Sequence, residues 1–165
     1  MFIALFFVAC ADKHQLLKLG TTSVKLDSTK SIYISISKDG RYGNINYQGS
    51  GENTSQIILM SLSKYSDNIE IANSYQSLKD ALNYSIKKDF KYLVFPTILE
   101  WEDRATEWSG ISDKASIKIR IIEVKTEKTL DSVIIKGKSG WATFGGDHPQ
   151  DLLPKPVEEY ILGLF

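Results

Sequence analysis

The sequence predicts one α/β domain in which helices cover a mixed β-sheet. Segments in which every second residue is apolar, as in strands, are separated by segments whose apolar residues have helical spacing. Two further strand-like segments follow one another near the C-terminus. The predicted order is β-α-β-α-β-β-β-α, in which the crossovers make parallel neighbours and the late hairpin adds antiparallel strands. The chain has 165 residues, 42% of them hydrophobic, so it can bury one core of its own.

The first predicted strand and helix are told apart by the spacing of their apolar residues. Over 31–37, SIYISIS, isoleucine alternates with serine or tyrosine, which indicates a strand. Over 54–65 the apolar residues recur at helical spacing. The side chains that can cap this helix are Asn53, Thr54 and Ser55.

A second strand and a second helix follow. NIEIA at 68–72 reads as a short strand, and 77–88 reads as a helix. Ser77 and Asp80 have the spacing of a capping box with an acid at its third helical position. The apolar stripe of this helix consists of Leu78, Ala81, Leu82 and Ile86.

Three strands complete the predicted sheet. The segment 92–101 is apolar on both faces, which predicts a central strand. Pro96 inside it cannot donate a ladder hydrogen bond, so we expect a bulge or a bend. The segments 115–126 and 129–139 form a hairpin, and the apolar residues of the first change parity after Ile121, which predicts a bulge.

The stretch SGWATFGGDHPQDLLPKP at 139–156 places Asp147 beside His148 and so raises the question of a metal site. Zinc sites use three or four ligands, mostly His and Cys, and the chain's other histidine is the distant His14. We therefore expect no metal here. A binding role for His148 stays open.

Helix-start chemistry explains the same stretch better. Asp147 as N-cap and Gln150 three residues later fit a capping box, and Pro149 suits a first turn, where its missing N–H costs nothing. A short helix is expected to end the chain at 157–165.

The stretch at 38–52 is rich in glycine, as phosphate-binding loops are, but the spacing of its glycines fits neither a Walker loop nor a dinucleotide-binding fingerprint. We expect a turn that leads into the helix. If it also contacts a partner, the contact residues are expected to be Arg41, Tyr42 and Tyr47, because arginine and aromatic residues are enriched at interfaces.

The segment 100–113 joins several carboxylates to Trp101 and Trp108. Paired carboxylates catalyse glycoside hydrolysis, and tryptophan stacks on sugars, so a glycan-binding or glycan-acting site is one hypothesis. The alternative is a charged loop with two tryptophans that pack or contact a protein partner.

The N-terminal run MFIALFFVAC is too short to span a bilayer and has the size of a signal-peptide core. Its end resembles the lipobox of bacterial lipoproteins, which implies a signal peptide at 1–9 and lipidation of Cys10, the chain's only cysteine. We expect 10–30 to be a lipidated tether and 31–165 to be a periplasmic domain. The tether residues that can pack back on the domain are Leu16, Leu17 and Leu19.

Together, the lipobox-like end and the motifs KDGRYGNINYQGSG and SGWATFGGDHPQDLL resemble a family of bacterial envelope lipoproteins catalogued as a domain of unknown function. The resemblance covers nearly the whole mature chain and implies no assigned activity. The element order is also similar to the TolB N-terminal region, the curli secretion lipoprotein CsgG and the lipoprotein activators of penicillin-binding proteins, which are binding or assembly modules.

These observations predict a lipid-anchored, non-catalytic protein that binds a partner in envelope assembly or maintenance and needs no cofactor. By resemblance to enterobacterial sorting, Ala11 after Cys10 favours the periplasmic face of the outer membrane. Lys plus Arg equals Asp plus Glu at 20 each, which argues against a nucleic-acid partner because such binders need a basic excess. The oligomeric state stays open.

Overall fold

The computed structural model describes residues 12–19, 24–103, 112–140 and 148–165. They form one α/β domain around a mixed six-stranded sheet, with a small two-stranded hairpin beside it. The elements in chain order are β1 (Lys13–Lys18), β2 (Ile32–Ile36), β3 (Arg41–Tyr42), β4 (Ile45–Asn46), α1 (Ser50–Leu62), β5 (Ile69–Tyr75), α2 (Leu78–Lys87), β6 (Tyr92–Glu102), β7 (Lys114–Glu123), β8 (Lys128–Lys138), the 3-10 helix η1 (Pro149–Leu152) and α3 (Pro154–Leu162).

The strand order across the sheet is β1-β8-β7-β6-β2-β5. Strands β5, β2 and β6 are parallel neighbours joined through α1 and α2, whereas β6, β7, β8 and β1 are antiparallel neighbours. The predicted fold class is therefore confirmed, as is the predicted order of the main elements, β2-α1-β5-α2-β6-β7-β8-α3, whereas the short strands β3 and β4 were not predicted. The central position predicted for β6 is also confirmed, since this strand lies between β7 and β2.

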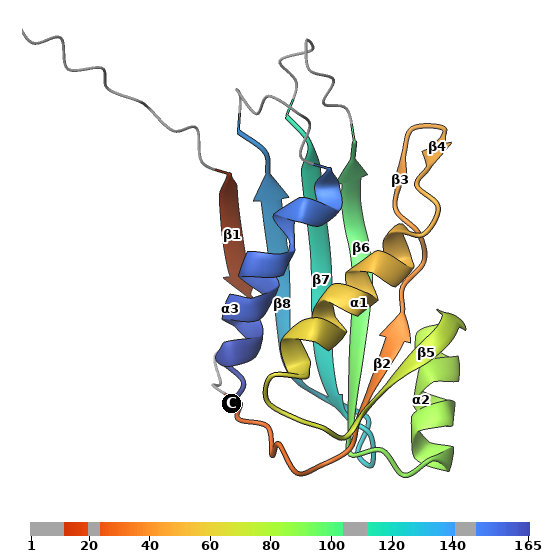
Figure 1. The fold of residues 1–165 in the computed structure, drawn as a ribbon. Coiled ribbons are helices and arrows are strands. Elements are labelled where there is room, and N and C mark those ends of the chain that lie inside the picture. The colour runs from red at the N-terminus through yellow and green to blue at the C-terminus, as the bar shows by residue number, and fades with distance from the viewer. Residues whose placement is uncertain (1–11, 20–23, 104–111, 141–147) are drawn as a thin grey trace, which may run out of the picture.

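Helices cover the two faces of the sheet unequally. Helices α1 and α3 lie side by side on one face, whereas α2 packs near β5 and β6 on the other (Figure 1). The main core fills the first face and includes Ile58 of α1, Ile34 of β2 and Ile161 of α3. A smaller core under α2 includes Tyr33 and Ala81. Neighbouring residues of one strand thus enter different cores, because side chains alternate across a sheet.

The parity change after Ile121 follows from this unequal cover. Ile121 joins the main core, whereas Ile122 and Val124 join the smaller core under α2. A register shift does occur at Ile121/Ile122, as predicted, and the residue without a partner in it is Leu130 of β8.

Pro96 causes less disturbance than its position in a central strand suggests. Strand β2 pairs with β6 only over Tyr92–Val94, so Pro96 has a partner strand on one side alone, where it lies opposite Ile119. The bulge in β6 falls further along, where Ile98 and Glu100 pair with consecutive residues of β7.

The tether expected over 10–30 is wrong for the part that the structure describes. Lys13–Lys18 forms the edge strand β1, in which Leu16 pairs with Ile135 of β8 and packs against the main core. Leu26 is also buried, and its N–H donates to the carbonyl of Leu164 at 2.7 Å. An edge strand needs only one partner, so its own sequence need not show the apolar alternation of a central strand.

Helix ends were predicted with mixed success. The Ser77 cap of α2 is confirmed, since its Oγ accepts a hydrogen bond from the N–H of Asp80 at 3.2 Å. Helix α1 begins at Ser50, earlier than predicted, and its N-cap is Gly49. The capping residues predicted for it lie inside the helix; these are Asn53, Thr54 and Ser55.

The short helical turn η1, which precedes α3, also starts one residue later than predicted. The N-cap of η1 is His148, whose N–H donates to Oδ2 of Asp151 at 3.0 Å, and not Asp147 with Gln150. Asp147 lies outside the described residues. Pro149 occupies the first turn of η1 as predicted. No helix within the described ranges is long and apolar enough to cross a membrane.

Candidate functional site

The glycine-rich stretch folds into the β3–β4 hairpin, which projects from one end of the sheet between β2 and α1 (Figure 1). We call this the hairpin end of the sheet; strands β2, β6 and β8 end there and β7 begins there. Gly43 turns the hairpin with a φ of 56°. At the base, the N–H of Tyr47 donates to the carbonyl of Gly40 at 3.0 Å, and the N–H of Gly40 donates to Oγ of Ser50 at 2.8 Å.

Two glycines of this stretch, Gly40 and Gly51, serve the packing of the chain rather than a phosphate. A Cβ on Gly40 would lie 2.5 Å from Cβ of Trp101, and one on Gly51 would lie 2.2 Å from the carbonyl oxygen of Ser37. The N–H of Gly51, at the start of α1, donates to Oδ1 of Asp39 at 2.9 Å. A carboxylate of the chain thus already holds the positive end of the helix dipole, where a bound anion would otherwise lie.

Two open hollows flank the hairpin and share Lys38, Asp39 and Asn46 in their walls. One, of about 460 Å³, extends toward Tyr75 at the end of β5. The other, of about 520 Å³, extends toward Leu99 on β6. The hairpin therefore stands between two concave surfaces at the hairpin end.

Exposed apolar side chains gather on the hairpin and on the walls of these hollows. The exposed fractions are 56% for Ile45, 37% for Tyr42, 56% for Tyr75 and 51% for Leu99. Leu99 is exposed because it is the extra residue of the bulge in β6 and has no partner in β7. We name these four residues the apolar rim.

The residues predicted for the hairpin differ in their exposure. Arg41 is exposed, and its Nε donates to the carbonyl of Gly43 at 3.0 Å. Tyr42 belongs to the apolar rim. Tyr47 is half-buried against the main core, and its hydroxyl donates to the carbonyl of Asp103 at 3.4 Å.

Trp101 is not a surface residue. Its side chain is 2% exposed and belongs to the main core, where it packs against Gly40. The prediction that Trp101 contacts a partner or a glycan is therefore wrong: its position in β6 turns it toward the face that α1 and α3 cover. Trp108 lies outside the described residues.

His148 lies at the same end of the sheet. Its Nδ1 is 3.3 Å from Oδ2 of Asp103, and 59% of its side chain is exposed. Together with Tyr47, this pair connects the end of β6 to the hairpin on one side and to η1 on the other.

The carboxylates of β6 do not form a glycosidase-like pair that is open to a substrate. Nζ of Lys114 lies 3.2 Å from Oε2 of Glu102 and 3.7 Å from Oε1 of Glu100, so one ammonium group binds both acids. Glu102 is moreover buried. Within the residues that the structure describes, no three His, Cys, Asp or Glu side chains come together as metal ligands would.

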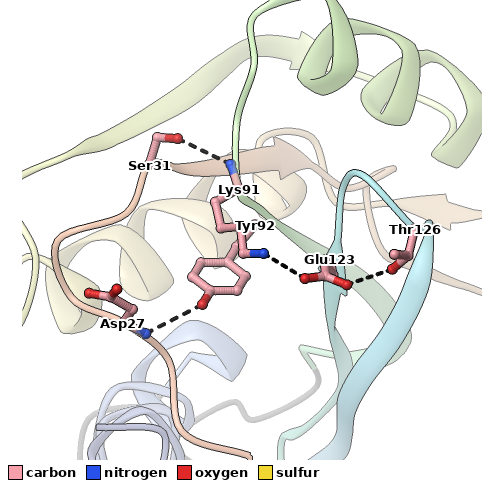
Figure 2. A network of polar contacts seen from close by, with 6 residues as sticks. All are labelled: Asp27, Ser31, Lys91, Tyr92, Glu123 and Thr126. Carbon is pink, nitrogen blue, oxygen red and sulfur yellow. Dashed lines mark hydrogen bonds and ion pairs between the residues drawn. The ribbon is translucent and has the colours of Figure 1, made fainter.

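The opposite end of the sheet is closed by polar contacts among the protein's own residues (Figure 2). Nζ of Lys91 lies 2.6 Å from Oε1 of Glu123, and Oγ1 of Thr126 donates to Oε2 of Glu123 at 2.7 Å. The hydrogen bonds from Lys91 and Thr126 hold the pKa of the Glu123 carboxyl below its ordinary value, and Glu123 raises the pKa of Lys91. Close by, the N–H of Asp27 donates to the hydroxyl of Tyr92 at 3.4 Å.

Comparison with protein families assigns the chain to one family. The family model described as Domain of unknown function (DUF4823) matches residues 24–164. The chain belongs to the DUF4823 family. The predicted membership of a family of unknown function is therefore confirmed. A search of curated protein sequences found no match for this DUF4823 chain.

Solved structures share the fold of this DUF4823 domain at low sequence identity. The PelC dodecamer from Paraburkholderia phytofirmans is 10% identical with a TM-score of 0.69, over 92% of this chain and 97% of that chain. Protein XCC0632 from Xanthomonas campestris is 6% identical with a TM-score of 0.52, over 86% of each chain.

Sequence reasoning predicted a turn at 38–52, where the structure has the β3–β4 hairpin, and it missed most of the apolar rim. Ile45 had a signal, since an isoleucine between Asn44 and Asn46 in a glycine-rich turn has no core to enter. Tyr75 had none, because β5 continues past the strand predicted at 68–72. Leu99 had none either, because its exposure depends on a bulge that only pairing with β7 creates.

Proposed function

We propose that this DUF4823 protein is a lipid-anchored protein of the bacterial envelope whose domain binds a protein partner and catalyses no reaction. The observation that carries the proposal is the apolar rim, which puts four large apolar side chains on one end of the domain around two open hollows. Exposed apolar and aromatic groups that gather on one surface mark sites of protein association.

The anchor rests on the residues around Cys10. The apolar run before it and the small residues Val8 and Ala9 match the pattern that precedes a lipidated cysteine. Several acyl chains hold a protein firmly in a bilayer, because each buried CH₂ contributes about 0.8 kcal/mol. Ala11 favours the periplasmic face of the outer membrane as the site of anchoring.

Incorporation of labelled palmitate tests the anchor. The full chain in a host that processes lipoproteins is expected to take up label and to sediment with membranes, and Cys10→Ala is expected to abolish both. Equal labelling and equal membrane fractionation of the two chains would contradict the anchor.

Site-specific photo-crosslinking tests the partner surface. A photoreactive residue at Ile45 is expected to give a discrete adduct with one envelope protein, and Tyr75→Ser and Leu99→Ser are each expected to weaken that adduct. Met60 on α1 is the matched control, since it is 60% exposed against 56% for Ile45 but lies away from the hairpin. The same adduct from both positions, or none from Ile45, would contradict the proposal.

A second candidate function is self-assembly into a homo-oligomer. The sheet ends on both sides in a strand with one partner, β1 and β5, and an exposed strand edge can pair with another chain. The PelC structure that shares the fold is of a dodecamer. Mass measurement of the full chain in detergent separates the candidates, because a monomer at micromolar concentration would exclude a stable ring.

A further inference from the structure

A second surface of the domain is set apart by its charge. The chain carries no net formal charge, yet lysines cluster on one face of β1, β8 and β7. Across these strands Lys13 pairs with Lys138, which in turn pairs with Lys114, so that the three form one row across the sheet. Lys136 lies on the same side, because residues two apart on a strand share a face. We name Lys13, Lys114, Lys136 and Lys138 the lysine face.

The lysine face is on the side of the sheet that α1 and α3 do not cover. The residues that alternate with these lysines, among them Ala115 and Ile135, enter the main core beneath those two helices. Helix α2 packs on β6 and lies far from β1 and β8 in Figure 1, so it leaves the lysine face open. Lys13, Lys136 and Lys138 are accordingly exposed.

The lysines surround a shallow hollow of about 250 Å³, whose wall also includes Gln15 and Glu100. The charge of Lys114 is neutralised by Glu100 and Glu102, at 3.7 and 3.2 Å. The other three lysines of the face make no ion pair with any described residue. The same face continues down β7 with Lys118 and Arg120. With Lys118 and Arg120 the positive charges outnumber the two carboxylates, so the surface is net positive and suited to a ligand with several negative charges.

The chain enters the sheet at this surface. Asp12 Oδ1 accepts a hydrogen bond from the N–H of Gly140 at 3.1 Å, which fixes Asp12 beside the ends of β1 and β8. Cys10 precedes Asp12 by two residues. Consecutive Cα atoms are about 3.8 Å apart, so a connection of two residues spans no more than about 8 Å. A membrane that holds a lipid on Cys10 therefore lies within reach of Lys13 and Lys138.

We propose that the lysine face binds the anionic head groups of the membrane that holds the Cys10 lipid. The domain then lies against the bilayer instead of standing off on a tether. Head groups fit better than an acidic protein, because the short covalent connection brings the bilayer to the lysine face whether or not a partner is present. This inference rests on the proposed lipid anchor, and its test separates the two.

Contact between the lysine face and anionic head groups is expected to depend on charge and on salt concentration. Each lysine near an anionic surface strengthens attachment about fivefold. Exposed charges are screened beyond about 3 Å at 1 M salt, so the contact is expected to weaken there while the lipid stays inserted. Loss of the contact thus leaves the protein on the membrane but free to move away from its surface.

The experiment places a fluorophore on the lysine face of the lipidated full chain. Once Cys10 is lipidated, Gln15→Cys supplies the free thiol for labelling, since the sequence has no other cysteine. The labelled protein is incorporated into vesicles of phosphatidylcholine, with or without phosphatidylglycerol, that contain a lipid with a nitroxide on its head group. Lys155→Cys on α3, which covers the opposite face of the sheet, is the control position.

We expect quenching at residue 15 to be at least twofold stronger with phosphatidylglycerol than without it, and to fall at 1 M salt. Changing Lys13, Lys136 and Lys138 to glutamine should remove this difference. The matched control changes Lys25, Lys30 and Lys155 to glutamine, which alters the net charge equally on the α3 side of the sheet and should leave the quenching unchanged. Circular dichroism of each variant verifies that it is folded.

Two results overturn the inference in different ways. Vesicle-bound protein whose quenching at residue 15 is the same in both kinds of vesicle would refute the lysine face as a lipid site and leave the anchor standing. Protein that carries no lipid and does not float with the vesicles would refute the anchor, and the inference with it.

Discussion

Replacement of Trp101 by alanine tests whether this ring serves the core or a binding surface. The side chain is 2% exposed and belongs to the main core. A buried aromatic side chain removes about 150–250 Å² from water, which at about 25 cal/mol per Å² corresponds to about 4–6 kcal/mol. Truncations of large aromatic residues in cores cost about 3–5 kcal/mol. We therefore expect Trp101→Ala to lower the free energy of unfolding by about 4 kcal/mol.

Urea unfolding followed by far-ultraviolet circular dichroism measures this loss, because that signal does not depend on the fluorescence of the ring removed. Trp101→Phe keeps an aromatic ring and should lose less. Met60→Ala, at a residue 60% exposed on α1, is the control and should change stability by no more than about 0.5 kcal/mol. A Trp101→Ala variant as stable as the wild type, but unable to bind cell-wall glycan fragments, would refute the reasoning and restore the glycan hypothesis.

Three further predictions concern backbone packing, capping and charge. Gly51→Ala should lower the free energy of unfolding by about 1–3 kcal/mol, because its Cβ would lie 2.2 Å from the Ser37 carbonyl oxygen. The urea midpoint should fall accordingly, and an unchanged midpoint would contradict this packing. Ser77→Ala should cost about 1 kcal/mol by loss of the α2 cap, measured in the same way. The pKa of Glu123 is lowered in the folded state by Lys91, so the stabilisation from this group is present at neutral pH and is lost as the pH falls through that lowered pKa. Glu123→Gln should therefore destabilise the protein at pH 7 and much less at pH 3, and an equal loss at both would refute the assignment.

The order of strands and helices could be predicted because the spacing of apolar residues that marks each element is a local property of the chain. Isoleucines at every second residue make β2 a strand whatever it pairs with, and Ser77 caps α2 from within its own turn. The start of α1 escaped prediction for the opposite reason. The N–H of Gly51 donates to Asp39, twelve residues earlier, and the N–H of Ser50 donates to the carbonyl of Tyr47. The helix therefore starts before Asn53, Thr54 and Ser55, which lie inside it.

The candidate surfaces depended more heavily on tertiary structure. The sequence predicted a turn at 38–52 with Arg41, Tyr42 and Tyr47 as contact residues if it binds a partner, and it also assigned Trp101 to a contact loop. A bulge decides which side chains of β6 face outward, and it leaves Leu99 exposed while Trp101 points into the core. The lysine face had no sequence signal, because Lys13, Lys114 and Lys136 come from three distant segments.

The sequence by itself determined the fold class, the order of the main strands and helices from β2 to α3 without the short β3–β4 hairpin, and the lipobox-like end at Cys10, because each of these depends on neighbouring residues. Only the tertiary structure decided that Lys13–Lys18 is an edge strand, that Trp101 is buried and that lysines from β1, β7 and β8 form one surface. The physical reason is that these features depend on strand register. Register joins residues far apart in the chain, and a shift of one residue would turn each side chain to the other face.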